Sequence, residues 1–407
     1  MSLIVQKYGG TSVADAEKIK NVARRVIATH QKGYQVVVVV SAMGDTTDDL
    51  LKLAKQVSSH PDEREMDFLL STGELVSSSL LALALKEMGQ PAVSLSGHQA
   101  GIYTERNHGK ARITAVEPRR ILRELDHGKV VIVAGFQGIT EDMDVTTLGR
   151  GGSDTTAVAL AAKLGATICG RYTDVDGVFT ADPRIVPKAR KLKDISYEEM
   201  LELASYGAKV MHPRAVELGA VYNIPILVAS SFTQAPGTLI HGGVLMEVRN
   251  KVRGIAHDLD VAKVTVLGVP DRPGIAAAIF EALAAANVSV DTIVQNASVE
   301  RITDLTFTVS RGDLEKAGGV IDPIVKDIGA RGFVSDSKLG KVSIVGTGMQ
   351  NAPGYAARMF KTMSDAGINI ELITTSEIRI TCIIDEAKVP QAVQALHNAF
   401  ELEKIDA

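Results

Sequence analysis

The chain has 407 residues, of which 45% are hydrophobic and 23% charged, and its net charge is −4. This length suffices for two or three domains with separate hydrophobic cores, and this composition excludes a disordered chain. The slightly acidic balance, together with an aromatic content of 4% and no tryptophan, argues against a basic or base-stacking surface for nucleic acid.

Cysteine usage and hydropathy limit the cellular setting. The two cysteines, Cys169 and Cys382, lie far apart and match no metal-ligand spacing, so we expect no metal site and a reduced, cytoplasmic setting. The longest aliphatic run, residues 36–40, is far too short to span a membrane, and no basic-then-apolar signal peptide opens the sequence. We therefore expect no membrane partner.

In chain order, the first 240 residues alternate short β-rich runs with longer helical patterns. Between the first two strands, Ile19, Val22 and Val26 follow helical spacing, and Gly33 lies where a C-cap glycine belongs. This alternation predicts an α/β fold with a parallel-rich sheet, helices on both faces and ligands at the carboxyl ends of the strands. The predicted strands are 3–7, 35–41, 92–95, 130–134, 167–173 and 225–229.

The first strand ends in the sequence LIVQKYGGTS, residues 3–12. Gly9 and Gly10 would expose backbone N–H groups, and the N-terminal dipole of the following helix would point toward them, which favours an anion site. Because Lys7 precedes the glycines, the spacing of a Walker phosphate loop is absent. An ordinary strand–turn–helix with an exposed lysine is the alternative interpretation.

Three further motifs place polar groups at strand ends or in helices. SAMGDTTDDLL, from Ser41, offers hydroxyls and amides for a second anion site. STGELVSSSLL places Glu74 in an apolar helical region, where a buried carboxylate needs a partner; a core arginine is the structural alternative. TTLGRGGSDTTA brings Arg150 and Asp154 in front of a helix, and the guanidinium there can bind a carboxylate through two parallel hydrogen bonds.

Two later motifs carry weaker signals. YTDVDGVFTADPR ends a strand with three aspartates, but the spacing of a calcium loop fails after Gly177, so a plain polar loop is the alternative. SYGAKVMHPRA supplies Lys209 and His212. Because no second histidine or cysteine stands at metal spacing, we interpret His212 as a loop hydrogen-bonder.

The last part of the chain contains an internal repeat. A boundary is predicted at residues 235–250, where proline and glycine cluster. Beyond it, the segments that start at Lys263 and Lys341 align with each other, so that Asp291 matches Glu371. Each copy reads as βαββαβ, the ferredoxin-like order. A duplicated structural module without a ligand is the alternative.

Taken together, the motifs resemble those of the aspartate kinases, members of the amino acid kinase family: KYGGTSV, SAMGDTTD, STGE, GRGGSDTTA, YTDVDGVFTADPR and SYGAKVMHPRA. The two repeats are similar to the paired ACT regulatory modules of these enzymes. The resemblance implies a catalytic domain at residues 1–245 and ACT modules at 246–338 and 339–407. It also implies transfer of the γ-phosphoryl group of ATP, which carries Mg²⁺, to the side-chain carboxylate of L-aspartate. The product, 4-phospho-L-aspartate, leads toward lysine, threonine and methionine.

The resemblance also assigns roles to single residues. Lys7, Asp154 and Lys209 would be catalytic, with Asp154 orienting the lysines or the metal-bound nucleotide. Arg150 would bind the α-carboxylate of aspartate, and Glu74 its ammonium group. Further contacts to aspartate would come from Thr47, Gly151, Gly152 and Ser153. The nucleotide would contact Lys7, Tyr8, Gly9, Gly10, Ser41, Thr173, Asp174, Phe179, Thr180, Ala181, Asp182, Pro183, Arg184 and Lys209.

The ACT modules are expected to bind lysine, threonine or both, and thereby to inhibit the kinase. Backbone amides of the turns DRPGI and NAPGY suit the carboxylate of an amino acid, and nearby polar side chains suit its ammonium group. The expected effector-binding residues are Asp271, Pro273, Gly274, Ile275, Ala276, Asn287, Val288, Asp291, Gln295, Asn351, Pro353, Gly354, Asn369, Ile370, Glu371, Ser376 and Glu377. Expected partners are further copies of the chain, as a homo-oligomer, or a shorter subunit that starts at Met246.

Two other functions remain as alternatives. A glutamate 5-kinase or an N-acetylglutamate kinase belongs to the same family, but neither combines KYGGTS and GRGGSDTTA with two ACT modules. A catalytically inactive amino acid sensor would keep the fold and bind effectors only. The presence of Lys7, Asp154 and Lys209 counts against such a sensor.

Overall fold

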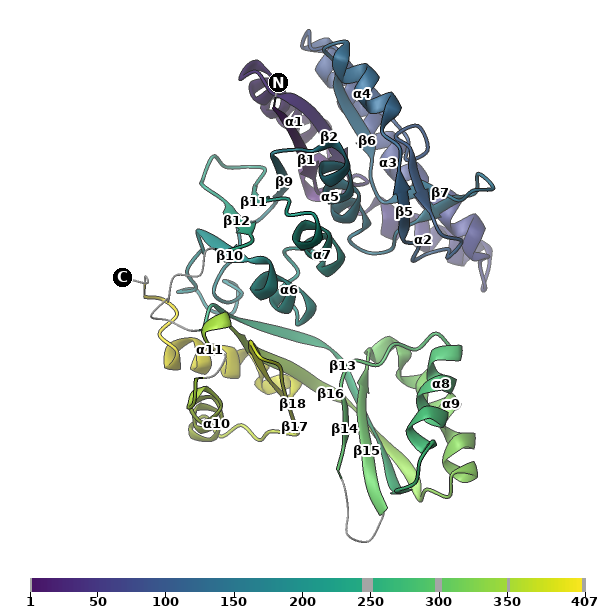
Figure 1. Ribbon diagram of the computed structural model, residues 1–407, viewed down its shortest axis with the longest axis vertical. Helices are drawn as coiled ribbons and strands as arrows, with labels where there is room; N and C mark the ends of the chain where they lie inside the picture. Colours follow the sequence, from purple (N-terminus) through teal and green to yellow (C-terminus); the bar gives the residue numbers. More distant parts are fainter. Residues whose placement is uncertain (1, 244–251, 297–301, 350–351, 405–407) are drawn as a thin grey trace. The chain divides into compact units, whose positions relative to one another are not determined.

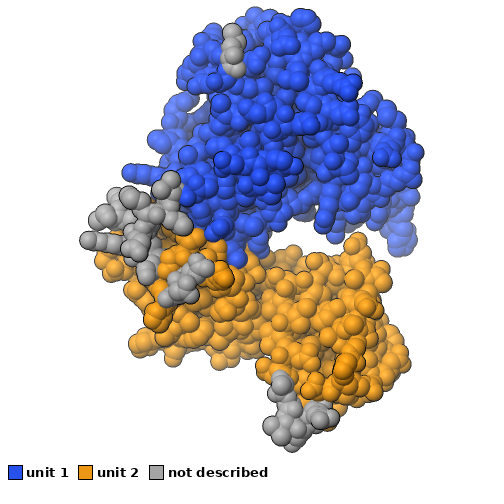
Figure 2. Space-filling view, in the orientation of Figure 1, with its two compact units in different colours: residues 1–179, 191–205, 209–246 blue, residues 180–190, 206–208, 247–407 orange. Residues whose placement is uncertain are grey.

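The computed structural model describes residues 2–243, 252–296, 302–349 and 352–404 (Figure 1). The chain forms two compact units (Figure 2). The first comprises Met1–Phe179, Lys191–Ser205 and Lys209–Met246, and the second comprises Thr180–Arg190, Tyr206–Ala208 and Glu247–Ala407. Two short stretches that lie between segments of the first unit in the sequence therefore belong to the second unit.

The first unit is built on an eight-stranded sheet in the order β10-β12-β11-β9-β1-β2-β6-β3. Neighbouring strands are parallel except β11 and β12, which are antiparallel. All six predicted strands are confirmed. The strands are β1 (Leu3–Tyr8), β2 (Gln35–Val40), β3 (Ala92–Leu95), β6 (Val130–Ala134), β9 (Ile168–Thr173), β10 (Asp194–Ser196), β11 (Ile226–Ser230) and β12 (Thr238–His241).

Helices pack on both faces of this sheet, as predicted. Val36, Val38 and Val40 of β2 share a core with α1 and α3, whereas Val39 points to the opposite face, which α5 covers. Because both faces of β2 are buried, its sequence is a continuous valine run instead of an alternating pattern. The helices are α1 (Ala16–Gln31), α2 (Thr46–Val57), α3 (Glu63–Glu87), α4 (Arg119–Asp126), α5 (Gly152–Leu164), α6 (Tyr197–Ser205) and α7 (Pro213–Val221).

A small second sheet in the first unit was not predicted. Its order is β5-β4-β7-β8, and its strands are β4 (Ile102–Thr104), β5 (Ile113–Val116), β7 (Gln137–Ile139) and β8 (Val145–Thr147). Strands of three or four residues are too short to display an alternating hydrophobic pattern. The sheet ends at β8, directly before the loop that carries Arg150.

The helix α3 is long and apolar. By length and composition alone, it is the one helix among the described residues that could cross a membrane. Half of its apolar window is buried inside the structure. Its carboxylates Asp67 and Glu74 are buried and accept hydrogen bonds from Gly109 and Ala42, so α3 serves here as a core helix of the first unit.

The second unit is built on a six-stranded antiparallel sheet in the order β14-β15-β13-β16-β18-β17. Its strands are β13 (Gly254–Pro270), β14 (Ile293–Gln295), β15 (Ile302–Val309), β16 (Gly332–Val345), β17 (Leu372–Thr375) and β18 (Arg379–Asp385). Helices α8 (Ile275–Ala285) and α9 (Leu314–Asp327) belong to the first copy of the repeat, and α10 (Tyr355–Asp365) and α11 (Val389–Ala399) to the second (Figure 1). Each copy has its own hydrophobic core.

Two long strands are shared between the copies. The start of β13, Gly254–Asp258, pairs with Val345–Lys341 of β16, and the later part of β13 pairs with the start of β16. The last strand of the second βαββαβ copy is therefore supplied from upstream of the first copy. The sequence left open whether each copy is contiguous; the structure shows that the second copy takes this strand from upstream of the first and that both copies form one continuous sheet.

Ion pairs join the two copies reciprocally. Lys263 of the first copy lies 2.8 Å from Glu371 of the second, and Lys341 of the second pairs with Asp291 of the first. Because Lys263 matches Lys341 and Asp291 matches Glu371 in the repeat, the same contact occurs twice. The shared strands and these ion pairs tie the two copies into one unit.

The two inserted stretches of the second unit make specific contacts there. Ile255 N donates a hydrogen bond to Thr180 O at 2.8 Å, and the Thr180 hydroxyl lies 3.0 Å from His397 Nε2 of α11. The Tyr206 ring lies 3.8 Å from the Arg379 guanidinium carbon. These stretches are therefore part of the packed structure of the second unit.

We predict that Gly207→Ala destabilises the protein more than Gly329→Ala does. Gly207 has φ +120°, and a Cβ there would lie 1.8 Å from His257 O of β13, whereas Gly329 has φ +74° and open space around it. The Gly329 change should cost about 1 kcal/mol, because only backbone strain is involved, and the Gly207 change about 2 kcal/mol or more. Thermal unfolding of both variants measures this difference. Equal shifts in Tm would contradict the packing of residues 206–208 against β13.

Candidate active site

A cluster of three charged side chains lies at the carboxyl end of the central strands of the first unit. Lys7 Nζ is 2.7 Å from Asp154 Oδ1, and Arg171 Nε is 3.0 Å from Asp154 Oδ2. Lys7 and Arg171 are paired residues of the parallel strands β1 and β9, so both side chains lie on the same face of the sheet. Asp154 is in the first turn of α5, where the helix dipole favours a negative charge.

Burial and charge determine the protonation of this cluster. Burial alone would raise the pKa of Asp154, but Arg171 and Lys7 outweigh it and hold the pKa far below its ordinary value. Burial lowers the pKa of Lys7, an effect that the Asp154 carboxylate opposes and Arg171 reinforces. Asp154 is therefore ionised at neutral pH and can serve as a counterion to both cations.

Glu74 is a second buried carboxylate of this unit. Its Oε1 accepts a hydrogen bond from Ala42 N at 3.0 Å, just beyond the end of β2. Its Oε2 is buried and has no hydrogen-bond partner among the described residues. Burial raises the pKa of Glu74 to about 7, although the Ala42 N–H and Lys7 oppose the shift. The structural alternative, a core arginine partner, is not found in the part of the chain that the structure describes.

The turns after β1 and β2 are bound to each other through the backbone. Gly44 N donates to Gly10 O at 3.1 Å, and Ser41 N donates to Tyr8 O at 3.1 Å. A Cβ on Gly10 would lie 2.8 Å from Ala42 O, so no other residue fits there without a shift. The predicted nucleotide contacts Tyr8, Gly10 and Ser41 are thus adjacent in space, as the sequence interpretation required.

At Gly151, the segment that carries Arg150 contacts the segment that carries Lys209 and His212. Gly151 has φ +70°, and a Cβ there would lie 2.3 Å from the ring of His212. Gly151 therefore serves both as the turn before α5 and as the contact surface for His212. Arg150 and Lys209 are themselves exposed, and no ion pair links either of them to another described residue.

The other predicted substrate and nucleotide residues are divided between the two units. Thr47 is half-buried in the first turn of α2, and Ser153 packs against Gly135 after β6. The Thr173 hydroxyl donates to Asp174 Oδ1 at 3.0 Å at the end of β9. Phe179 also belongs to the first unit, but residues 180–184 belong to the second. The predicted nucleotide set is therefore divided between the two units.

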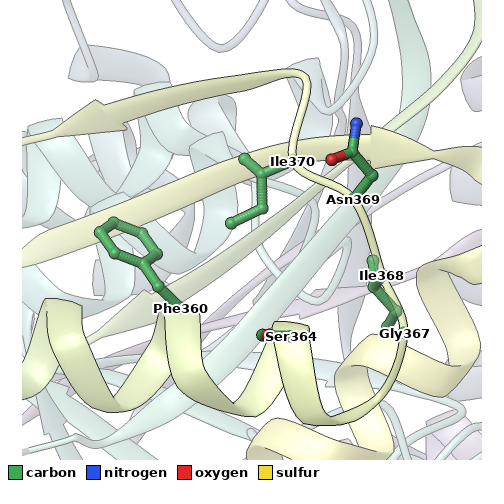
Figure 3. A pocket seen from close by; sticks show the side chains of 6 residues that line it. All are labelled: Phe360, Ser364, Gly367, Ile368, Asn369 and Ile370. Carbon is green, nitrogen blue, oxygen red and sulfur yellow. The ribbon is translucent and has the colours of Figure 1, made fainter.

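The expected effector residues lie in the second unit. Asn369 and Ile370 line an open pocket of about 460 Å³, in which Phe360 and Ile370 point toward each other (Figure 3). Asp291 and Glu371, expected to bind an ammonium group, are paired with lysines of the other copy. Gly274 and Gly354 occupy equivalent left-handed positions before α8 and α10. Asn351 and Met246 lie outside the described residues.

Two structural features were missed by the sequence analysis. Arg171 was not recognised, although its place beside Lys7 follows from aligning the parallel strands β1 and β9. Asp67 is fully buried and accepts hydrogen bonds from Thr147 Oγ1 at 2.5 Å and Gly109 N at 3.0 Å. The signal for Asp67 was its spacing of two helical turns from Glu74, which places both on one face of α3.

Comparison with known proteins agrees with this architecture. Residues 2–230 match the sequence model of the amino acid kinase family, and residues 263–322 and 342–400 each match an ACT domain. The chain therefore belongs to the amino acid kinase family, and its two C-terminal repeats are ACT domains. The predicted fold class is confirmed.

Individual relatives make the assignment more specific. Aspartokinase of Geobacillus stearothermophilus is 54% identical over 402 residues, which cover 99% of this chain and 98% of the relative. Aspartokinase of Mycolicibacterium smegmatis is 52% identical over 407 residues, which cover 99% of this chain and 97% of the relative. Within the family, the chain is therefore grouped with the aspartokinases.

Solved structures give the same grouping. E. coli aspartokinase III in complex with aspartate and ADP, in its R-state, has a TM-score of 0.83 at 25% identity, covering 98% of this chain and 99% of that one. The T-state complex of E. coli aspartokinase III with lysine and aspartate has a TM-score of 0.74 at 26% identity, with the same coverage.

We predict that the stability of the free protein depends on pH through Glu74. The folded-state pKa of about 7 lies above the ordinary 4.5, so wild type loses stability as the pH rises through this range. Glu74→Gln removes this loss, and its advantage over wild type should grow between pH 5 and pH 8 by up to about 3 kcal/mol.

The measurement is thermal unfolding of wild type and variant at both pH values. Glu124→Gln is the control, because the cations Lys129 and Arg120 hold the pKa of Glu124 below its usual range, to about 2. Its difference from wild type should therefore stay constant over the same interval. If Glu74→Gln gives an equally constant difference from wild type, the assignment of a raised pKa to a buried Glu74 carboxylate is wrong.

Proposed function

We propose that the protein is an aspartate kinase, which transfers the γ-phosphoryl group of ATP to the side-chain carboxylate of L-aspartate and releases ADP. The product, 4-phospho-L-aspartate, would enter the synthesis of lysine, threonine and methionine. The full-length similarity to aspartokinases supports this activity. The observation in the structure that supports it best is that the same unit holds two buried charged sites. One is the cationic cluster around Lys7, and the other is the Glu74 carboxylate, whose Oε2 has no hydrogen-bond partner among the described residues.

The residues present suit the chemistry of a carboxylate acceptor. An aspartate side chain is ionised at neutral pH, so the reaction needs no general base. It does need positive charge, because two anions must approach each other while negative charge moves between them. Lys7, Arg171 and Asp154 together carry one net positive charge in a buried environment, where charges interact more strongly than in water.

Aspartate would be held at both ends by charges of opposite sign. The exposed guanidinium of Arg150 can bind the α-carboxylate through two parallel hydrogen bonds. The free Oε2 of Glu74 can accept from the ammonium group, which would also lower the pKa of Glu74 and keep it ionised. Thr47, Gly151, Gly152 and Ser153 would complete the aspartate site.

ATP would bring its own Mg²⁺ as part of the substrate. Lys7, the turns with Gly9, Gly10 and Ser41, and Lys209 would meet its phosphates. An adenine nucleotide is supported by the ADP complex of E. coli aspartokinase III.

The second unit would bind an end-product amino acid and turn the kinase down. The lysine complex of E. coli aspartokinase III supports lysine, and threonine remains a second candidate. Asn369 and Ile370 line a pocket of suitable size for an amino acid side chain. A preference of about 1–3 kcal/mol for the inhibited arrangement would suffice for a strong effect. Assembly as a homo-oligomer, or with a shorter subunit from Met246, and a cytoplasmic setting remain predictions.

We predict that Lys7→Ala and Arg150→Ala fail in different ways in an assay of ADP release. Lys7 would act on charge that develops in the transition state, so its loss should lower kcat by about 100-fold or more. Arg150 would bind aspartate before the reaction, so its loss should mainly raise KM for aspartate. Lys20→Ala, which removes an exposed lysine paired with Glu17, should leave both constants unchanged. The reverse pattern would refute these roles.

We also predict that lysine, threonine or both bind the full-length protein in calorimetry. Asn369→Ala should weaken this binding roughly tenfold, the equivalent of one lost hydrogen bond. Asn398→Ala, an exposed asparagine of α11, is the matched control and should bind as wild type does. Absence of binding by both amino acids would leave the ACT domains as structural modules.

A further inference from the structure

Arg171 has a chemical role that the proposed set of catalytic residues does not include. Its Nε donates to Asp154 Oδ2 at 3.0 Å, while Lys7 holds the other oxygen at 2.7 Å. The Asp154 side chain is only 4% exposed and the Arg171 side chain 13%. One carboxylate therefore has two cations as partners in a place largely closed to water.

The charge balance shows what Arg171 contributes. An isolated Lys7–Asp154 pair would be neutral, and its effect on an approaching anion would be that of a weak dipole. With Arg171 present, the same cluster carries a net charge of +1. A net charge in a poorly solvated site acts more strongly, and over a longer distance, than a dipole.

We propose that Arg171 is a positioning residue that engages Asp154, so that the ammonium of Lys7 retains uncompensated positive charge for the moving phosphoryl group. This inference rests on the proposed kinase activity and on the role of Lys7 within it. Arg171 acts through Asp154 and Lys7 and is not itself assigned a contact with substrate.

The surroundings of Lys7 support this assignment. The charged or titratable groups that act most strongly on Lys7 are Asp154 of α5 and Arg171 and Cys169 of β9, and Lys7 also interacts with Glu74 of α3. Burial raises the pKa of Cys169 to about 12, so its thiol is neutral. Among the groups that act most strongly on Lys7, Arg171 is the cation.

A second observation concerns the hydrogen bonds of the Arg171 guanidinium. Its Nη1 is fully buried and has no hydrogen-bond partner among the residues that the structure describes. A buried donor without a partner costs free energy, so Arg171 is not optimised for stability alone. An arginine also remains charged at any pH at which the protein is folded, which makes its own contribution to the charge of the cluster permanent.

The test compares Arg171→Met and Arg171→Lys in the ADP-release assay over a range of pH. Arg171→Met should lower kcat about tenfold or more, with little change in KM for aspartate, since only the transition-state field is lost. Arg171→Lys keeps a cation and should recover most of this loss. Arg25→Met is the control. Arg25 is a half-buried arginine of α1 that lies over the ring of Tyr172, the neighbour of Arg171 in β9, and its loss should change kcat little.

The pH profile separates this role from a structural one. Because Arg171 repels the Lys7 ammonium, its removal should raise the pKa of Lys7 and move the alkaline limb of kcat to higher pH, although the plateau falls. A merely structural loss would lower the plateau without moving the limb.

The outcomes distinguish the two levels of the proposal. If wild type shows no aspartate-dependent ADP release, the proposed function fails. If wild type is active and Arg171→Met keeps its kcat, or loses it with an unmoved alkaline limb and no recovery in Arg171→Lys, then the role of Arg171 is overturned while the proposed function stands.

Discussion

The ion pair between Lys7 and Asp154 is the contact on which the arrangement of the first unit depends. It joins the end of β1 to the first turn of α5, and both side chains are almost fully buried. Removing either partner from such a pair leaves a buried charge that costs about 3–5 kcal/mol, yet replacing both by apolar residues is often neutral. Stability alone therefore does not account for charges at this place. Their value lies in the field they create at the carboxyl ends of β1, β2 and β9.

The second unit imposes a different constraint, because it includes two short segments, Thr180–Arg190 and Tyr206–Ala208, from the part of the sequence that otherwise forms the first unit. Thr180 is bound to Ile255 and His397, and Gly207 packs against the backbone of β13. Thr180 directly follows Phe179 of the first unit, and Gly207 lies two residues before Lys209. The second unit is therefore joined by short stretches of chain to segments that we propose to bind the nucleotide and to take part in catalysis. A rearrangement of this unit can act on those segments through these connections. Such connections are the physical basis that feedback inhibition would require.

The sequence was sufficient where local pattern decides structure. The valine run of β2 and the glycines of KYGGTSV and GRGGSDTTA predicted the sheet and the turns at its carboxyl edge. The sequence was insufficient where contacts between segments far apart in the chain decide the structure. Arg171 became significant only through its register with Lys7, and the strand Gly254–Asp258 joins the second ACT copy through pairing with residues nearly 90 positions away. Asp67 looked like an ordinary helix residue, because its partners Thr147 and Gly109 come from β8 and from a separate turn, both distant in sequence.

A double-mutant cycle on Lys7 and Asp154 tests the central claim most directly. Steady-state kcat would be measured for Lys7→Met, Asp154→Asn, the double variant and wild type, with folding checked by thermal unfolding. If the pair acts as one unit, each single change removes most of the rate and the double variant is about as slow as the slower single variant. If the losses in the double variant multiply, the two residues act independently, and the account of a joint charge cluster is contradicted.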